Sequence, residues 1–83
     1  MKLSDSVAGL LRIASWLGPE TCTWLWHQWS SWWCPGAEGN AGRWLYEYLL
    51  ESARLEGYLS VDECNVVRLT ARGRQALAAW LAS

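Results

Sequence analysis

The chain has 83 residues, of which 52% are hydrophobic, and it contains eight tryptophans but no phenylalanine. This length suffices for one domain over residues 1–83 and excludes two ordinary domains, and a small core cannot cover so many large apolar side chains. Seven basic and eight acidic residues give a formal net charge of −1, which excludes a strong overall attraction to nucleic acid or to an anionic membrane.

A first helix is predicted to begin at Ser4 or Asp5, which are good N-cap residues, and to end at Gly18. Ile13 and Trp16 fall outside its main apolar stripe. We expect these two residues to form a second apolar face that packs against a C-terminal helix or another copy of the chain, and we predict a homodimer through them. Projected at about 100° per residue, the main stripe contains Val7, Leu10, Leu11, Ala14 and Leu17.

A second helix is predicted to open at Pro19, Glu20 and Thr21 and to run to about Trp33, with proline suited to a first turn and glutamate to the positive end of the helix dipole. Trp24 lies roughly opposite the apolar face of this helix and should be exposed. The apolar face itself consists of Cys22, Leu25, Trp26, Trp29, Trp32 and Trp33.

One proline and three glycines in residues 34–42 indicate a loop. A third helix should follow over residues 41–56 and stop at Gly57, with Leu45, Leu49, Leu50 and Ala53 facing inward.

Two short β-prone runs at residues 58–61 and 66–70 are separated by a turn sequence at 62–65, which predicts a hairpin. Thr70 then caps a last helix with Leu77, Trp80 and Leu81 on one side. The predicted fold is therefore mainly α-helical with a small β-hairpin.

Two stretches of the second half resemble a known family. Leu49-Leu50-Glu-Ser-Ala53-Arg-Leu-Glu-Gly57-Tyr-Leu59 is similar to the end of a recognition helix that runs into a wing strand. Val67-Arg68-Leu69-Thr70-Ala-Arg72-Gly73-Arg74-Gln-Ala-Leu77 resembles the Leu-Thr-x-x-Gly-Arg signature that closes the wing. Over residues 43–77 the chain thus resembles winged helix-turn-helix regulators of the multiple-antibiotic-resistance and phenolic-acid types.

The resemblance implies that residues 41–56 are a recognition helix, with Asn40, Arg43, Tyr46 and Glu47 at its groove-facing start, and that residues 61–66 form the wing tip. DNA-reading members place basic residues on this helix and wing, because phosphate neutralisation supplies much of their affinity. Here the recognition helix also carries Glu51, and the wing tip carries Asp62 and Glu63. The family therefore favours DNA as a ligand, whereas the charges oppose it.

The residue types that could support chemistry do not form a recognisable site. Cys22 and His27 would point about 140° apart on a helix, and no Cys-x-x-Cys pair is present. No nucleophile has an identifiable base and orienting carboxylate. We therefore expect no metal, no cofactor and no enzymatic activity. An odd cysteine count is typical of reduced thiols, and no apolar run reaches the roughly 18 residues of a membrane span, so we expect a cytoplasmic protein that does not enter membranes.

Two functions remain. The favoured one is a protein-interaction module, which could be a phage- or mobile-element-type inhibitor or adaptor of a host complex by analogy with anti-CRISPR proteins; its expected partner-binding residues are Trp24, Arg43, Tyr46, Glu47, Glu51, Asp62 and Glu63. The alternative is a dimeric DNA-binding transcriptional regulator that would contact duplex DNA through Asn40, Arg43, Arg68, Arg72 and Arg74.

Overall fold

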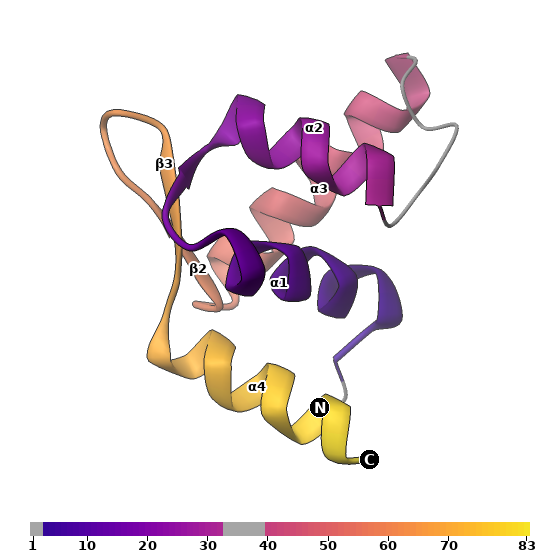
Figure 1. The fold of residues 1–83 in the computed structure, drawn as a ribbon, viewed down its shortest axis with the longest axis vertical. Coiled ribbons are helices and arrows are strands. Elements are labelled where there is room, and N and C mark those ends of the chain that lie inside the picture. Colours follow the sequence, from indigo (N-terminus) through magenta and orange to yellow (C-terminus); the bar gives the residue numbers. More distant parts are fainter. Residues whose placement is uncertain (1–2, 33–39) are drawn as a thin grey trace.

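The computed structural model describes residues 3–32 and 40–83. This part of the chain is mainly helical and contains an antiparallel hairpin, as predicted (Figure 1). Its elements are α1 (Asp5–Leu17), β1 (Glu20–Thr21), α2 (Cys22–Trp32), α3 (Asn40–Leu55), β2 (Leu59–Val61), β3 (Val66–Leu69) and α4 (Ala71–Ala82). Helix α1 contacts each of the other three helices, and α4 lies on the side of α1 away from α2.

Helix α1 has the ends that its sequence predicts. The Ser4 side chain accepts a hydrogen bond from the Val7 N–H at 3.3 Å, and Gly18 ends the helix with a φ of 75°. The predicted dimer contact of Ile13 is wrong, because this residue is only 2% exposed and belongs to the core. A helix that contacts three others is buried on more than one stripe, so the main apolar stripe covers only part of the buried surface of α1.

The predicted start of α2 is also corrected, because Glu20 and Thr21 form a strand and the helix begins at Cys22. Thr21 pairs with Val66 of β3, and the Cys22 N–H donates to the Asn65 carbonyl at 2.9 Å. This long-range pairing outweighs the local preference for a helical first turn. The resulting sheet has the order β1-β3-β2 and is antiparallel throughout.

The core is formed mainly by α1, α2 and α3, with Leu59, Val67 and Leu77 from β2, β3 and α4, and it includes most of the predicted inward positions. Leu25, Trp26 and Trp29 of α2 are buried, whereas Trp24 is exposed, as predicted. The predicted core position at Trp33 and the side chain of Trp32 lie outside the described part of the chain. On α4, Leu77 is buried and Trp80 is partly buried, but Leu81 is exposed, contrary to the prediction. Leu49 and Ala53 of α3 are buried, and Leu45 and Leu50 are partly buried.

The junction between the hairpin and α4 depends on Thr70 and Gly73. The Thr70 hydroxyl donates to the Gly57 carbonyl and accepts from the Gly73 N–H at 3.0 Å, so it caps α4 and ties it to the end of α3. A Cβ at Gly73 would overlap the Tyr58 carbonyl oxygen. The Leu-Thr-x-x-Gly spacing therefore has a local cause: a threonine cap is followed by a glycine where two backbones meet.

We expect Gly73→Ala to lower the free energy of unfolding by about 2–4 kcal/mol, because the Tyr58 backbone must move to admit a methyl group. Gly18→Ala adds a side chain at a positive φ with open space around it, and it should cost about 1–3 kcal/mol from backbone strain alone. Urea denaturation measures both values. A gain in stability from Gly73→Ala, as expected where alanine replaces an ordinary helical glycine, would contradict the close approach at Gly73.

We expect Trp29→Ala to lower the free energy of unfolding by about 3–5 kcal/mol, because it empties a fully buried site in the core. Trp24→Ala removes the same side chain from the exposed face of the same helix and should change stability by less than about 0.5 kcal/mol. Guanidinium unfolding followed by circular dichroism compares the pair.

Candidate interaction surface

The outward face of α3 carries three large apolar side chains. Trp44 is 68% exposed, Tyr48 58% and Leu55 73%. Helical geometry places these three positions within an arc of about 40°, directly opposite the buried residues Tyr46 and Ala53. We call this row of three residues the α3 stripe.

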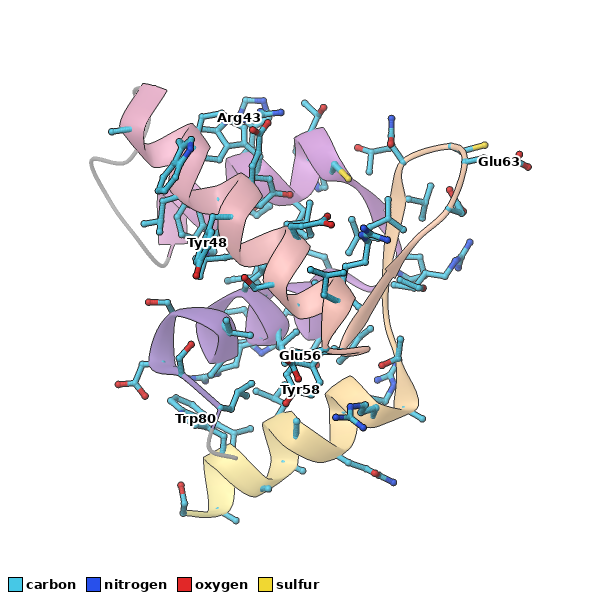
Figure 2. All side chains as sticks on the ribbon, turned by 180° about the vertical axis from the view of Figure 1, so that it is seen from behind. Arg43, Tyr48, Glu56, Tyr58, Glu63 and Trp80 are labelled. Carbon is cyan, nitrogen blue, oxygen red and sulfur yellow. The ribbon has the colours of Figure 1, made fainter. Side chains whose placement is uncertain are left out.

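The two aromatic rings of the α3 stripe contact each other. The centroids of Trp44 and Tyr48 are 5.9 Å apart and their planes differ by 12°, so the rings are stacked. Figure 2 shows Tyr48 projecting from α3. Sequence reasoning missed Tyr48 and Leu55. The same helical projection, applied to the side of the third helix that faces away from its inward leucines, would have found them.

The charged residues of α3 flank the stripe on one side and form ion pairs with one another. Arg43 Nε lies 3.1 Å from Glu47 Oε1, and Arg54 Nε donates to Glu51 Oε2 at 3.0 Å. The hydrogen bond from Arg54 lowers the pKa of the Glu51 carboxyl. Because each arginine is matched by a glutamate, these four side chains together carry no net charge.

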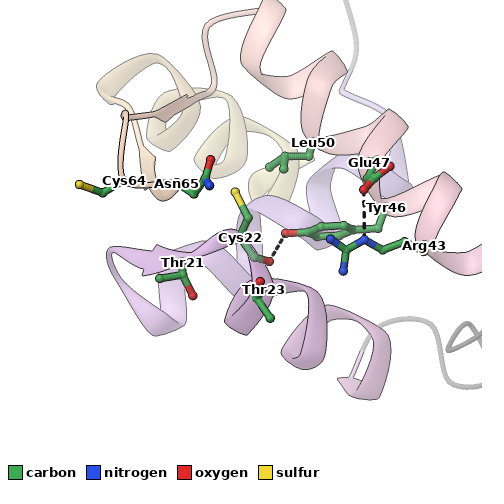
Figure 3. Close-up of a pocket in the computed structure, with 9 residues that line it drawn as sticks. All are labelled: Thr21, Cys22, Thr23, Arg43, Tyr46, Glu47, Leu50, Cys64 and Asn65. Carbon is green, nitrogen blue, oxygen red and sulfur yellow. Dashed lines mark hydrogen bonds and ion pairs between the residues drawn. The ribbon is translucent and has the colours of Figure 1, made fainter.

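Arg43 has a second set of contacts. Its guanidinium lies over the rings of Trp26 and Tyr46, at 5.3 and 5.9 Å from the centroids. These cation–π contacts and the ion pair with Glu47 hold Arg43 against its own domain. The predicted groove-reading arginine is therefore engaged in intramolecular contacts, as Figure 3 shows for Glu47 and Tyr46.

Tyr46 is not a surface residue, so its predicted role as a partner contact is wrong. It is 1% exposed, and its hydroxyl donates to the Cys22 carbonyl at 2.8 Å. Its position about 200° around α3 from Trp44 turns it into the core. Burial raises the pKa of the Tyr46 phenol well above its usual range.

At the tip of the hairpin, Asp62 has a local structural role. Its Oδ1 accepts hydrogen bonds from the N–H groups of Cys64 at 2.8 Å and Val66 at 3.1 Å, and Asn65 adopts a φ of 60°. Asp62 therefore shapes the turn. Glu63 is exposed at the tip and points into solvent (Figure 2).

The remaining predicted nucleic-acid contacts are spread over two elements. Arg68 on β3 lies 3.9 Å from Asp62, and Arg72 on α4 lies over the Tyr58 ring at 5.7 Å. Arg74 projects about 200° around α4 from Arg72, so those two side chains diverge. The side chain of Asn40 lies outside the described part of the structure.

Two other surfaces contain predicted residues. Trp16 is exposed on α1, with the Arg12 guanidinium 5.1 Å from its ring, so self-association through Trp16 remains a prediction. A pocket of about 490 Å³ lies where α2, α3 and the hairpin turn meet (Figure 3). Cys22 lines this pocket, and burial raises the pKa of its thiol.

Within residues 3–32 and 40–83, no group of three or more histidine, cysteine or acidic side chains is arranged to hold a metal ion. The helices in those ranges lack the length and hydropathy needed to span a membrane. Cys34 lies outside both ranges.

We expect the stability of the domain to fall with rising pH above about 10, the usual pKa of tyrosine. In this range the unfolded chain releases the Tyr46 proton, whereas the folded chain retains it because burial raises the pKa of the phenol. One such group changes the free energy of unfolding by about −1.4 kcal/mol per pH unit. Tyr46→Phe should flatten this dependence between about pH 10 and 11.5 in urea denaturation series. Identical slopes for the two proteins would contradict the burial of the phenol.

Comparison of the chain with models of protein families, with curated proteins and with solved structures found no match. The functional assignment therefore depends on the chemistry of the surfaces described above.

Proposed function

We propose that the domain is a winged helix that acts as a non-enzymatic protein-interaction module and contacts its partner through the α3 stripe. The order α1-β1-α2-α3-β2-β3 supports the winged-helix assignment, because β1 joins the hairpin to form a sheet of order β1-β3-β2. In that arrangement α3 corresponds to the recognition helix and residues 61–66 to the wing tip, with its turn at 62–65.

The observation that carries the proposal is the chemistry of the outward face of α3. A helix that enters a DNA groove needs basic and hydrogen-bonding side chains on this face. Here Trp44, Tyr48 and Leu55 occupy it, and Arg43 and Arg54 are paired with glutamates. Tryptophan and tyrosine are the residue types that dominate protein–protein hot spots, because they offer a large contact area at low entropic cost.

The cysteine chemistry also supports a binding role. Burial raises the pKa of the Cys22 thiol, whereas a catalytic cysteine needs a lowered pKa to provide thiolate. Cys22 and Cys64 are free thiols, as expected in the reducing cytoplasm where we place the protein. By analogy of size and fold alone, the module suits an inhibitor or adaptor of a larger host complex, of the kind that phages and mobile elements encode.

We expect the double variant Trp44→Ala/Tyr48→Ala to weaken partner binding by at least about 2 kcal/mol, which is roughly 30-fold. The partner is captured from the native cytosol on the tagged wild-type protein and then titrated, after purification, against each variant. Leu81→Ala is the control, because Leu81 is an exposed apolar residue on α4. Trp24→Ala tests the partner contact that the sequence predicts on α2.

Specific binding to duplex DNA would contradict the proposed function. A transcriptional regulator would bind a duplex tightly at about 150 mM salt, and this binding would weaken steeply as the salt concentration rises. The binding would also disappear in Arg43→Ala and persist in Trp44→Ala/Tyr48→Ala. The proposal would be wrong if this pattern were observed.

A further inference from the structure

We propose that the partner inserts an arginine from an amphipathic helix into a site formed by Trp44, Glu47, Tyr48 and Glu51. This inference rests on the proposed function and specifies the chemistry of the partner. The four residues occupy positions i, i+3, i+4 and i+7 of α3, so their side chains are neighbours on one face. We call these four residues the α3 diamond.

The α3 diamond combines two kinds of group that bind a guanidinium. The stacked rings of Trp44 and Tyr48 are more than half exposed and offer aromatic faces for cation–π contact. The side chains of Glu47 and Glu51 are 60% and 54% exposed, and each carboxylate has lone pairs beyond those used by its arginine.

The distribution of charge along α3 favours a cation at the centre of the diamond. The order Arg43, Glu47, Glu51, Arg54 places two carboxylates side by side, one helical turn apart, and the two arginines at the outer ends. Like charges at i and i+4 repel each other. A cation that lies between the two carboxylates relieves this repulsion, and the exposed ion pairs are weak enough to share their carboxylates with it.

The same distribution opposes a second copy of this chain as the partner in an antiparallel arrangement. Its order of positive, negative, negative and positive charges reads identically in both directions. Two copies of α3 packed antiparallel across this face would therefore bring Glu47 of each copy near Glu51 of the other, with their arginines likewise adjacent. A complementary partner needs positive charge where this helix carries its glutamates.

Arginine fits the α3 diamond better than lysine does. Its planar guanidinium stacks on an aromatic ring while its forked N–H groups reach carboxylates, whereas an ammonium is a compact, strongly hydrated charge. Leu55 lies seven residues beyond Tyr48, which is about 10 Å along the helix. The partner helix should therefore carry an apolar residue about two turns from its arginine.

A display library of helical peptides tests this chemistry directly, even while the natural partner is unidentified. The library is selected on the wild-type protein and depleted on Trp44→Ala/Tyr48→Ala. We expect the enriched peptides to carry arginine at a fixed position and an apolar residue about two turns away. Glu47→Gln/Glu51→Gln should weaken the best peptide about tenfold.

The matched control is Glu56→Gln/Glu63→Gln, which changes the net charge equally. Both control carboxylates are exposed, and Figure 2 shows Glu56 near Tyr58 and Glu63 at the hairpin tip, both away from Tyr48. Any of three results would overturn the inference. The enriched peptides could lack arginine, they could bind equally well after arginine is replaced by lysine, or the two double variants could weaken peptide binding equally. If such peptides still required Trp44 and Tyr48, the protein-interaction function would stand.

Three further outcomes would contradict the inference. A wild-type dimer in sedimentation experiments that Trp44→Ala/Tyr48→Ala converts to a monomer would assign the face to a second copy. Flotation with phosphatidylserine vesicles that is lost in the same variant would assign it to a lipid surface. Failure of the library to yield any peptide dependent on Trp44 and Tyr48 would contradict the inference, whereas the proposed function is tested separately by the titration of the captured partner.

Discussion

The packing of three aromatic rings between α2 and α3 determines how the rest of the domain is arranged. The centroids of Trp26, Trp29 and Tyr46 lie 5.3 to 6.0 Å from one another, which is the range of favourable aromatic pairs. The Tyr46 hydroxyl also donates to the Cys22 carbonyl at the first residue of α2. The cluster therefore sets both the distance between the two helices and the rotation of α3 about its axis. Once Tyr46 faces inward, helical geometry requires Trp44 and Tyr48 to face solvent.

The aromatic cluster has a cost that its burial offsets. Trp29 Nε1 is buried and has no hydrogen-bond partner among the described residues, which costs about 1–3 kcal/mol relative to a paired indole. Burial of the Trp29 ring and its contacts with Trp26 and Tyr46 stabilise the fold by a comparable or larger free energy. In a chain without phenylalanine, the large rings of the core must come from residues that carry a polar atom. Tyr46 places its polar atom on a carbonyl, whereas Trp29 does not.

Local signals predicted most of the fold. Ser4, Gly18, Gly57 and Thr70 act within a few residues of their own positions, and the structure confirms each of them as a cap or a stop. Strand β1 could not be predicted in this way, because two residues carry no periodicity and their pairing partner Val66 lies far along the chain.

The residues of the candidate surface were harder to predict, because exposure depends on the number of neighbours of each helix and on its rotation. The prediction for Ile13 left open whether its apolar face packs within the domain or on another copy of the chain, and the prediction for Tyr46 followed from the family resemblance, which placed it at the start of a DNA-reading helix. Both residues lie in the core. The sequence showed that acidic residues on the third helix conflict with a DNA-binding role. It did not show the ion pairs on that helix, because these pairs depend on side-chain rotamers. The composition did predict that large aromatic side chains would be exposed, and the structure confirms this at Trp16, Trp24 and Trp44.

The order of the sheet limits how this apolar chain could associate with other copies through its strands. The central strand β3 is paired on both sides, so only β1 and β2 present free edges, and these strands have two and three residues. An edge this short offers too few unpaired backbone groups to recruit a strand from another molecule. Edge-to-edge polymerisation is therefore opposed by strand length, and at β1 also by the charge of Glu20 and by Pro19 directly before the strand. The exposed tryptophans and tyrosine lie on helices, where the backbone is already hydrogen-bonded. The domain can consequently display a large aromatic surface without also offering a template for cross-β aggregation.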